Sequence, residues 1–91
     1  NHGGGIFDIL DGPNRLPRPI QKTYFLTPQP LTAARSAADF GLDYLHCCDA
    51  AGLLAALPAL FARRERGAIL EIETDMTINT QVFERFKALL A

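Results

Sequence analysis

The sequence predicts an α/β fold, namely part of an open parallel sheet with flanking helices. From residue 31 onward, helical and strand patterns alternate in the order helix, strand, helix, strand, helix, and this alternation is typical of parallel sheets with right-handed crossovers. Residues 68–73 combine an apolar run with a short alternation, which indicates a mostly buried parallel strand. Because two strands make a poor sheet, we expect a further strand to end just before Asn1.

Length and composition define the class of protein. A chain of 91 residues holds one domain at most and buries only a thin core. Its 48% hydrophobic and 21% charged residues are ordinary for a globular protein. The net charge of −1 gives no reason to expect binding to nucleic acid or to membranes. The sequence contains neither a signal-peptide pattern nor an apolar run long enough to cross a bilayer, so we expect a cytoplasmic protein.

Residues 11–30 are predicted to form a long, proline-rich irregular connection within this domain. Five of the six prolines lie here, and proline is excluded from helix interiors and central strands. One interpretation is a lid, or a rim in which Arg15, Arg18 and Lys22 attract a polycarboxylate substrate. The other, which we favour, is a surface loop packed through its apolar side chains, Leu16, Ile20, Tyr24 and Phe25.

A helix over residues 31–41 and a strand over Asp43–Cys47 are predicted next. Gly41 suits the position after the last helical turn. Cys47 and Cys48 are adjacent, and neighbouring cysteines rarely form a disulfide, so we expect two reduced side chains at the strand end. His46 has no partner at metal or triad spacing and is interpreted as structural.

Two further helices are predicted around the strand at residues 68–73. Asp49 is expected to cap the first, and Pro58 inside it predicts a kink or two helical pieces. Residues 74–78 are predicted to be a loop, and residues 79–90 a helix capped by Asn79 or Thr77. Apolar side chains are expected to face inward on both helices, namely Leu53, Leu54, Leu57, Leu60 and Phe61 on the first and Val82, Phe83, Phe86, Leu89 and Leu90 on the second.

The opening stretch Asn1-His2-Gly3-Gly4-Gly5-Ile6-Phe7 carries the candidate site. Three consecutive glycines can take positive φ and permit close approach by a ligand. A glycine triplet is also typical of a flexible linker, but linkers rarely lead directly into an apolar run such as Ile6-Phe7. The stretch is not a dinucleotide-binding fingerprint, because Gly-x-Gly-x-x-Gly is absent.

This stretch resembles the second half of the thiamine diphosphate signature of the SEPHCHC synthase family (2-succinyl-5-enolpyruvyl-6-hydroxy-3-cyclohexene-1-carboxylate synthases of menaquinone biosynthesis). Residues 37–44 and 69–75, followed by Asn79, resemble the family's helix-to-strand passage and its last strand. The resemblance covers most of the chain. It implies the C-terminal part of a thiamine diphosphate-binding domain, with the first half of the signature, Gly-Asp-Gly, lying outside the sequence.

The resemblance also implies roles for the opening residues. Asn1 and Gly3 would hold Mg²⁺, or Mn²⁺ in its place, through an amide oxygen and a backbone carbonyl, and Mg²⁺ prefers such hard oxygen ligands. Gly4, Gly5 and Ile6 would join Asn1 and Gly3 in binding thiamine diphosphate. An apolar substrate pocket would be shaped by Ile6, Phe7 and Leu10. The resemblance assigns no catalytic residue to this chain.

The activity implied for the parent enzyme is decarboxylation of 2-oxoglutarate and addition of the succinyl carbanion equivalent to isochorismate, in a homo-oligomer. The fragment alone should be inactive, because the glutamate that activates the cofactor lies in another domain. His2 stands where Asn is usual, Asp8 replaces a common Ser, and Met76 falls where a basic residue is common. Two alternatives stay open: another thiamine diphosphate-dependent 2-oxoacid decarboxylase or acetolactate synthase-like enzyme, and a non-catalytic α/β interaction module.

Overall fold

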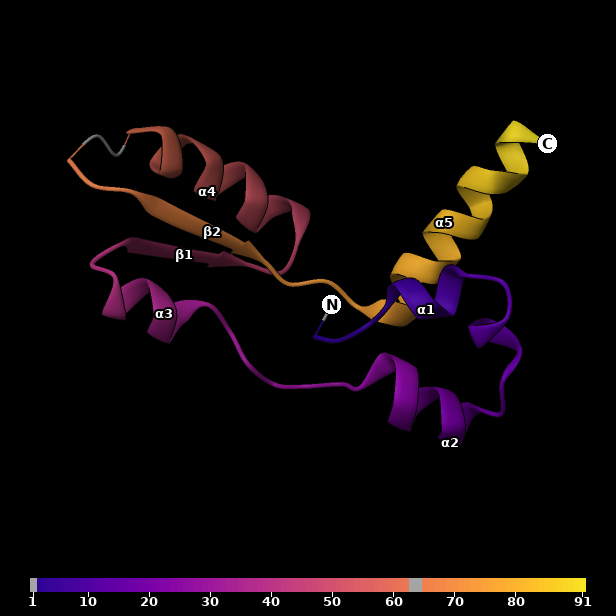
Figure 1. Cartoon of the computed structure of the whole chain (residues 1–91). Coiled ribbons are helices and arrows are strands. Elements are labelled where there is room, and N and C mark those ends of the chain that lie inside the picture. Colours follow the sequence, from indigo (N-terminus) through magenta and orange to yellow (C-terminus); the bar gives the residue numbers. More distant parts are fainter. Residues whose placement is uncertain (1, 63–64) are drawn as a thin grey trace. The chain divides into compact units, whose positions relative to one another are not determined.

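A computed structural model of the chain describes residues 2–62 and 65–91. The contacts divide it into two compact units, residues 1–30 with 74–91 and residues 31–73, where the length predicts a single domain. Residues 27–32 and 73–75, which connect the units in sequence, have no regular secondary structure. The elements in chain order are α1 (Ile6–Ile9), η1 (Pro13–Arg15), α2 (Arg18–Gln21), η2 (Lys22–Leu26), α3 (Ala34–Asp39), β1 (Asp43–Cys47), α4 (Ala50–Ala62), β2 (Ala68–Ile72) and α5 (Met76–Leu90) (Figure 1).

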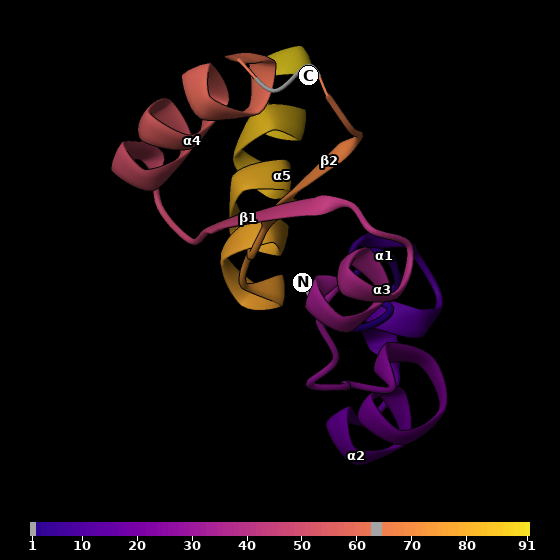
Figure 2. The same cartoon turned by 90° about the vertical axis from the view of Figure 1, so that its left-hand side faces the viewer.

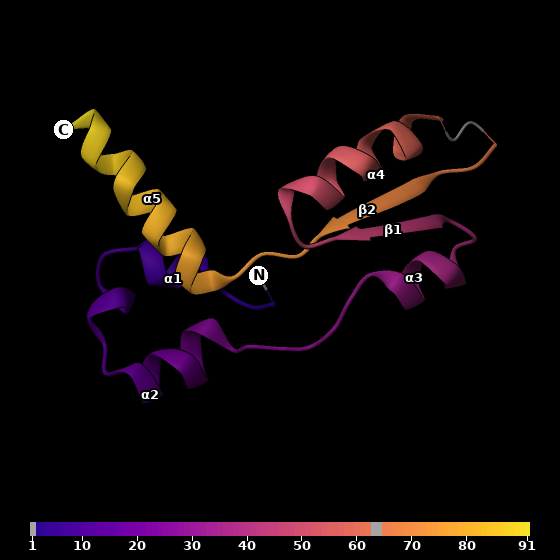
Figure 3. The same cartoon turned by 180° about the vertical axis from the view of Figure 1, so that it is seen from behind.

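Residues 31–73 confirm the predicted parallel sheet with flanking helices. β1 and β2 pair in parallel, with Asp43 opposite Ala68 and Cys47 opposite Ile72. α4 lies on one side of the two strands and α3 on the other (Figures 2 and 3). Ala37 of α3 and Cys47 at the end of β1 are buried between these layers. The strand β2 is only half-buried, and Ile72 is 49% exposed, so the prediction of a mostly buried strand was wrong for the described residues.

α4 confirms its predicted cap but not its predicted interruption. The backbone N–H of Gly52 donates to Asp49 Oδ1 at 2.6 Å. Pro58 lies inside one continuous α-helix, because the alanines and leucines around it are strong helix formers. Leu54 and Phe61 are 71% and 74% exposed, so the buried stripe of α4 is narrower than predicted. The strands beneath cover the face that carries the half-buried side chains, Leu53, Leu57 and Leu60.

α3 is shorter than the predicted helix, since it begins at Ala34 and ends at Asp39. Gly41 follows with φ = 64°, a left-handed conformation that glycine adopts without steric cost. The prediction for this glycine is therefore confirmed.

α5 begins three residues earlier than predicted. Its N-cap is Asp75, whose side chain accepts a hydrogen bond from the backbone N–H of Ile78 at 2.9 Å, so the predicted caps Thr77 and Asn79 lie inside the helix. Asn79 instead donates to the Thr74 hydroxyl at 2.9 Å. Thr74, Asp75, Thr77 and Asn79 all have cap-forming side chains, and the sequence alone does not choose among them.

The apolar face of α5 is more exposed than predicted. Exposed fractions run from 36% for Phe83 to 83% for Leu89. In the same unit α5 contacts α1, a helix of 4 residues against the 15 of α5, which is too short to cover it. The two helices leave an open groove of about 410 Å³. Its lining residues are Ile9, Asn79, Val82, Phe83 and Phe86.

The interpretation of residues 11–30 as an irregular connection needs correction at residues 18–26, where α2 continues into the π-helical turn η2. Pro17 and Pro19 stand at the helix start, where a missing N–H is tolerated, and no proline interrupts residues 20–27. Ile20 and Tyr24 are 45% and 74% exposed, so the predicted packing through them was wrong. Leu26, at 2% exposure, is the apolar side chain that this segment buries.

No described helix has both the length and the apolar character needed to cross a membrane.

Candidate functional site at the glycine-rich opening

The glycine triplet lies tightly against the end of η2. A Cβ atom added to Gly3 would lie 2.4 Å from Leu26 O, and one added to Gly4 would lie 2.4 Å from Phe25 O. The N–H of Gly4 donates to Leu26 O at 2.7 Å, and the N–H of Gln29 donates to His2 O at 2.8 Å. Glycine is therefore required at both positions because another backbone segment occupies the space of a side chain.

The described glycines of the triplet do not use the positive φ that glycine permits. Among the described glycines, positive φ occurs at Gly12 and Gly41, whereas His2, just before the triplet, has φ = 54°. Gly5 takes right-handed helical angles and precedes the first turn of α1. These contacts also argue against a flexible linker, since the described part of the opening stretch is fixed by hydrogen bonds and packing on its own chain.

The three apolar residues expected to shape the pocket face different surroundings. The ring of Phe7 packs edge-on against Phe25, with centroids 5.4 Å apart and an angle of 68° between the planes. Ile6 and Leu10 are 54% and 45% exposed. Leu10 directly follows α1, and its backbone N–H donates to Ile6 O at 3.1 Å, so the two residues lie one turn apart. Ile9 faces the groove beside α5.

The expected metal ligands are described in part. Asn1 lies outside the described residues, so its proposed roles in metal and cofactor binding are not visible. Gly3 is held beside Leu26 and Met76. The expected donors, a neutral amide oxygen and a backbone carbonyl, suit Mg²⁺, with phosphate oxygens and water completing its shell. In the part of the chain that the structure describes, no group of three or more His, Cys, Asp or Glu side chains forms an alternative metal site.

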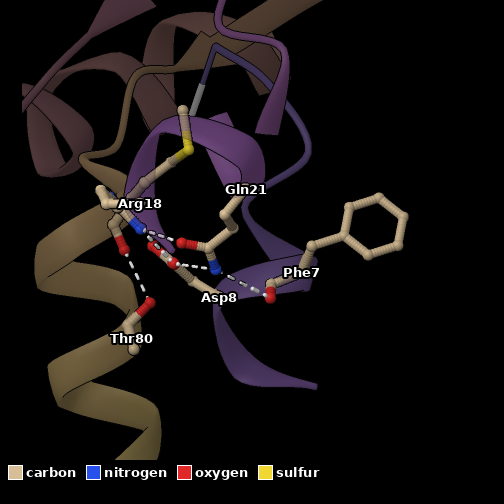
Figure 4. A network of polar contacts seen from close by, with 6 residues as sticks. Phe7, Asp8, Arg18, Gln21 and Thr80 are labelled. Carbon is tan, nitrogen blue, oxygen red and sulfur yellow. Dashed lines mark hydrogen bonds and ion pairs between the residues drawn. The ribbon is translucent and has the colours of Figure 1, made fainter. Parts of the chain in front are cut away.

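A polar network that sequence reasoning missed joins α1 to α2 (Figure 4). Arg18 Nη1 donates to Asp8 Oδ1 at 2.6 Å and to Gln21 Oε1 at 2.7 Å. Gln21 Nε2 donates to Asp8 Oδ1 at 2.8 Å and to Phe7 O at 3.3 Å. Gln21 is 2% exposed, and a side chain so buried needs these partners. Asp8 and Arg18 were both noticed in the sequence, but nothing in it pairs residues ten positions apart across a proline-rich stretch.

The network also changes the electrostatic expectation. Arg18 forms an ion pair with Asp8, whose side chain is 11% exposed. Arg15 lies 3.9 Å from Asp11, and both side chains are at least 80% exposed, so this pair is weak. Of the three basic residues, Arg18 at least is part of the internal structure of this unit. A basic rim for a polycarboxylate therefore has less support than the sequence suggested.

Titratable side chains within residues 31–73 form hydrogen bonds with other residues of that unit. The Tyr44 hydroxyl donates a hydrogen bond to Glu71 Oε2, and this bond raises the pKa of Tyr44 above its ordinary value of 10.0. The N–H of Ala33 donates to the same oxygen at 3.0 Å. His46 Nε2 lies 2.9 Å from Glu73 Oε2, which agrees with a structural histidine.

The two cysteines are free, as predicted, with Cys47 buried and Cys48 exposed.

Comparison with known proteins gives a consistent result. No protein-family model matches the sequence. The chain is 48% identical over 87 residues to the 2-succinyl-5-enolpyruvyl-6-hydroxy-3-cyclohexene-1-carboxylate synthase of Cytophaga hutchinsonii, an alignment covering 96% of this chain and 15% of that protein. It is 34% identical over 86 residues to the synthase of Porphyromonas gingivalis, covering 94% of this chain and 15% of that protein. It is 36% identical over 93 residues to the synthase of Salinibacter ruber, covering 97% of this chain and 14% of that protein.

The chain spans about 15% of the length of the curated relatives it matches. The alignments nevertheless include nearly all of its residues. The resemblance inferred from the opening motif is confirmed: over almost its whole length this chain is related in sequence to the SEPHCHC synthases, and it matches one short segment of these longer proteins.

Proposed function

We propose that this chain is the C-terminal part of the thiamine diphosphate-binding domain of a SEPHCHC synthase. The parent enzyme would decarboxylate 2-oxoglutarate and transfer the succinyl unit to isochorismate. The observation that carries the proposal is the 48% identity over 87 residues to the Cytophaga synthase. The packing of the glycine triplet supports it, because the motif that carries the resemblance is a fixed part of the fold.

Most residues of the opening motif have a role in this proposal. The Asn1 amide oxygen and the Gly3 carbonyl bind Mg²⁺ without adding charge, which leaves the ion's charge for a diphosphate group. The family pattern also assigns Gly4 and Gly5 to cofactor binding, although the side-chain space of Gly4 is filled by Phe25 O and Gly5 is buried in this chain. The exposed side chains of Ile6 and Leu10 exclude water from the reacting groups. When bound, thiamine diphosphate supplies the electron sink for decarboxylation.

The chain by itself should be inactive. On the family pattern, the remaining metal ligand and the activating glutamate belong to other parts of the enzyme. The described residues also include a half-covered sheet and an open apolar groove. A complete site therefore requires the longer protein.

The pairing of Asp8 removes one objection to 2-oxoglutarate as the substrate. A free carboxylate at this position, where Ser is common, would repel an anionic 2-oxoacid substrate and would favour a different one. Asp8 is instead 11% exposed and neutralised by Arg18. This departure therefore gives no reason to prefer another 2-oxoacid decarboxylase or an acetolactate synthase-like enzyme.

A chimera tests the proposal. The matching segment of the full-length Cytophaga synthase would be replaced by this chain, and the binding of Mg²⁺ and thiamine diphosphate would be measured together with product formation. We expect the chimera to need both 2-oxoglutarate and isochorismate. Asn1→Ala should weaken cofactor binding at least about tenfold, the usual effect of losing a metal-site group.

The control is Gln81→Ala, because Gln81 is exposed on α5 and should leave binding unchanged. Unchanged affinity for Mg²⁺ and thiamine diphosphate in Asn1→Ala would refute the metal assignment. Product formation without isochorismate would favour another 2-oxoacid decarboxylase. Complete absence of cofactor binding by the chimera would favour a non-catalytic module.

A further inference from the structure

We propose that Gln21 is a positioning residue that fixes the segment 6–10, so that Ile6 and Leu10 are held in place to form a wall of the substrate site. This inference rests on the proposed function for its consequence in catalysis. Its structural part, the fixing of segment 6–10 by Gln21, stands on contacts among described residues alone. The two parts can be tested separately.

The first step is that Gln21 is buried and uses its whole amide group. At 2% exposure, its Oε1 accepts from Arg18, and its Nε2 donates to Asp8 and to the backbone oxygen of Phe7. The contact with Phe7 O reaches the backbone of α1 directly. A helix of 4 residues is too short to be stable by itself, so its position depends on such outside contacts.

The second step is that these contacts lie on one side of α1. Phe7 packs on Phe25, and Asp8 faces Arg18 and Gln21. Gly4, just before the helix, is bonded to Leu26 O at 2.7 Å. Residues 4–8 are thus attached at several points to residues 18–26, which themselves are helical.

The third step is that Ile6 and Leu10 remain outside this interface. They are 54% and 45% exposed, although both are large apolar side chains at the start and end of a fixed turn. The network therefore holds the backbone while leaving these two side chains available. Loss of the Gln21 contacts would free the turn to shift, and a displaced wall weakens substrate binding even when the chemistry is intact.

The test uses Gln21→Met in the chimera, since methionine keeps the volume of the side chain and removes its polar contacts. We expect the backbone amides of residues 7–10 to exchange hydrogen at least about fivefold faster, the usual scale for one lost hydrogen bond, since Gln21→Met removes three of them. We also expect the KM for 2-oxoglutarate to rise about tenfold with kcat changed less than about twofold, because a pocket wall contributes binding equally to ground and transition states.

Two controls separate positioning from simple destabilisation. Gln81→Met makes the same substitution at an exposed position on α5 and should change neither readout. Tyr44→Phe removes the bond to Glu71 in the other unit, and any loss of folded enzyme that it causes should lower apparent kcat without changing KM. Should Gln21→Met fail to fold, Arg18→Met removes two bonds of the network from a side chain that is 57% exposed and should give the same pattern.

The outcomes are distinct. Unchanged exchange at residues 7–10 would overturn the inference whatever the enzyme does. Faster exchange with unchanged KM would show that Gln21 is structural and would also overturn it. If the unmodified chimera bound no thiamine diphosphate, the proposed function and the role in catalysis would fail together, while the exchange data would still decide whether Gln21 holds the turn.

Discussion

Replacement of Gly4 by alanine puts a methyl group against a backbone carbonyl. The new Cβ would lie 2.4 Å from Phe25 O and 3.0 Å from the ring of Phe7. Since real Cβ atoms almost never come within 3.0 Å of another heavy atom, the opening stretch must move away by about 0.6 Å, and such overpacking costs about 1–3 kcal/mol. The movement also loosens the hydrogen bond from Gly4 N to Leu26 O, which contributes about 1 kcal/mol.

A smaller effect acts in the opposite direction. Alanine restricts the unfolded chain more than glycine does, which stabilises the folded state by about 0.4–1 kcal/mol. Residues 2–4 and residues 25–29 pack together at a junction. Gly4→Ala is therefore expected to lower the free energy of opening this junction by about 2 kcal/mol. At about 1.4 kcal/mol for each factor of ten, the junction should open roughly 30-fold more often.

Hydrogen exchange of the chimera measures this opening. The reporter is the amide of Gln29, which donates to His2 O across the same junction. The matched control is Gly67→Ala, whose added Cβ would meet only Leu42 Cδ2, the end of a flexible side chain, at 3.0 Å. We expect faster exchange at Gln29 in Gly4→Ala and no change in Gly67→Ala. Equal protection of Gln29 in both variants would refute the argument that glycine is required here for close backbone approach.

Two further predictions concern alkaline pH and association. Because the pKa of Tyr44 is raised by its bond to Glu71, this bond stabilises residues 31–73 fully below pH 10 and is lost as the pH rises through the raised pKa. Thermal unfolding of the chimera followed from pH 8 to about 11 should show this loss, and Tyr44→Phe should reduce it; identical pH profiles would contradict the assignment. The isolated 91-residue chain should self-associate with rising concentration through α5, where Val82, Phe86 and Leu89 are more than half exposed, and Phe86→Lys should weaken it. A clean monomer in sedimentation at every concentration would refute this.

Local signals predicted several elements well because their causes are local. The strand Asp43–Cys47 was predicted with its observed bounds. The cap at Asp49 and the left-handed Gly41 followed from side-chain and backbone preferences that act within a few residues. The parallel pairing of the strands followed from the alternation of elements, since a crossover helix joins parallel neighbours.

Elements were predicted less well where several residues could each begin or end the helix. The start of α5 was misplaced because several cap-forming residues stand close together, and the observed cap, Asp75, is chosen by the register of the whole helix. The helical segment at residues 18–26 was missed because the prolines at 17 and 19 suggested a loop, although both suit a helix start. The buried positions of Gln21 and Leu26 then follow from packing against α1 and the glycines, which no local pattern reveals.

The sequence by itself determined the α/β class, the order of the helices and strands from residue 31 onward, and the motif that relates this chain to SEPHCHC synthases. These follow from periodicity, capping chemistry and residue identity, all of which are written along the chain. Only the tertiary structure shows the reason for the glycines: residues 3 and 4 lie close to the carbonyls of Leu26 and Phe25, where a side chain would not fit. It also decided that Asp8 is neutralised by Arg18 and oriented by Gln21, because pairing between distant residues depends on how the chain folds back on itself.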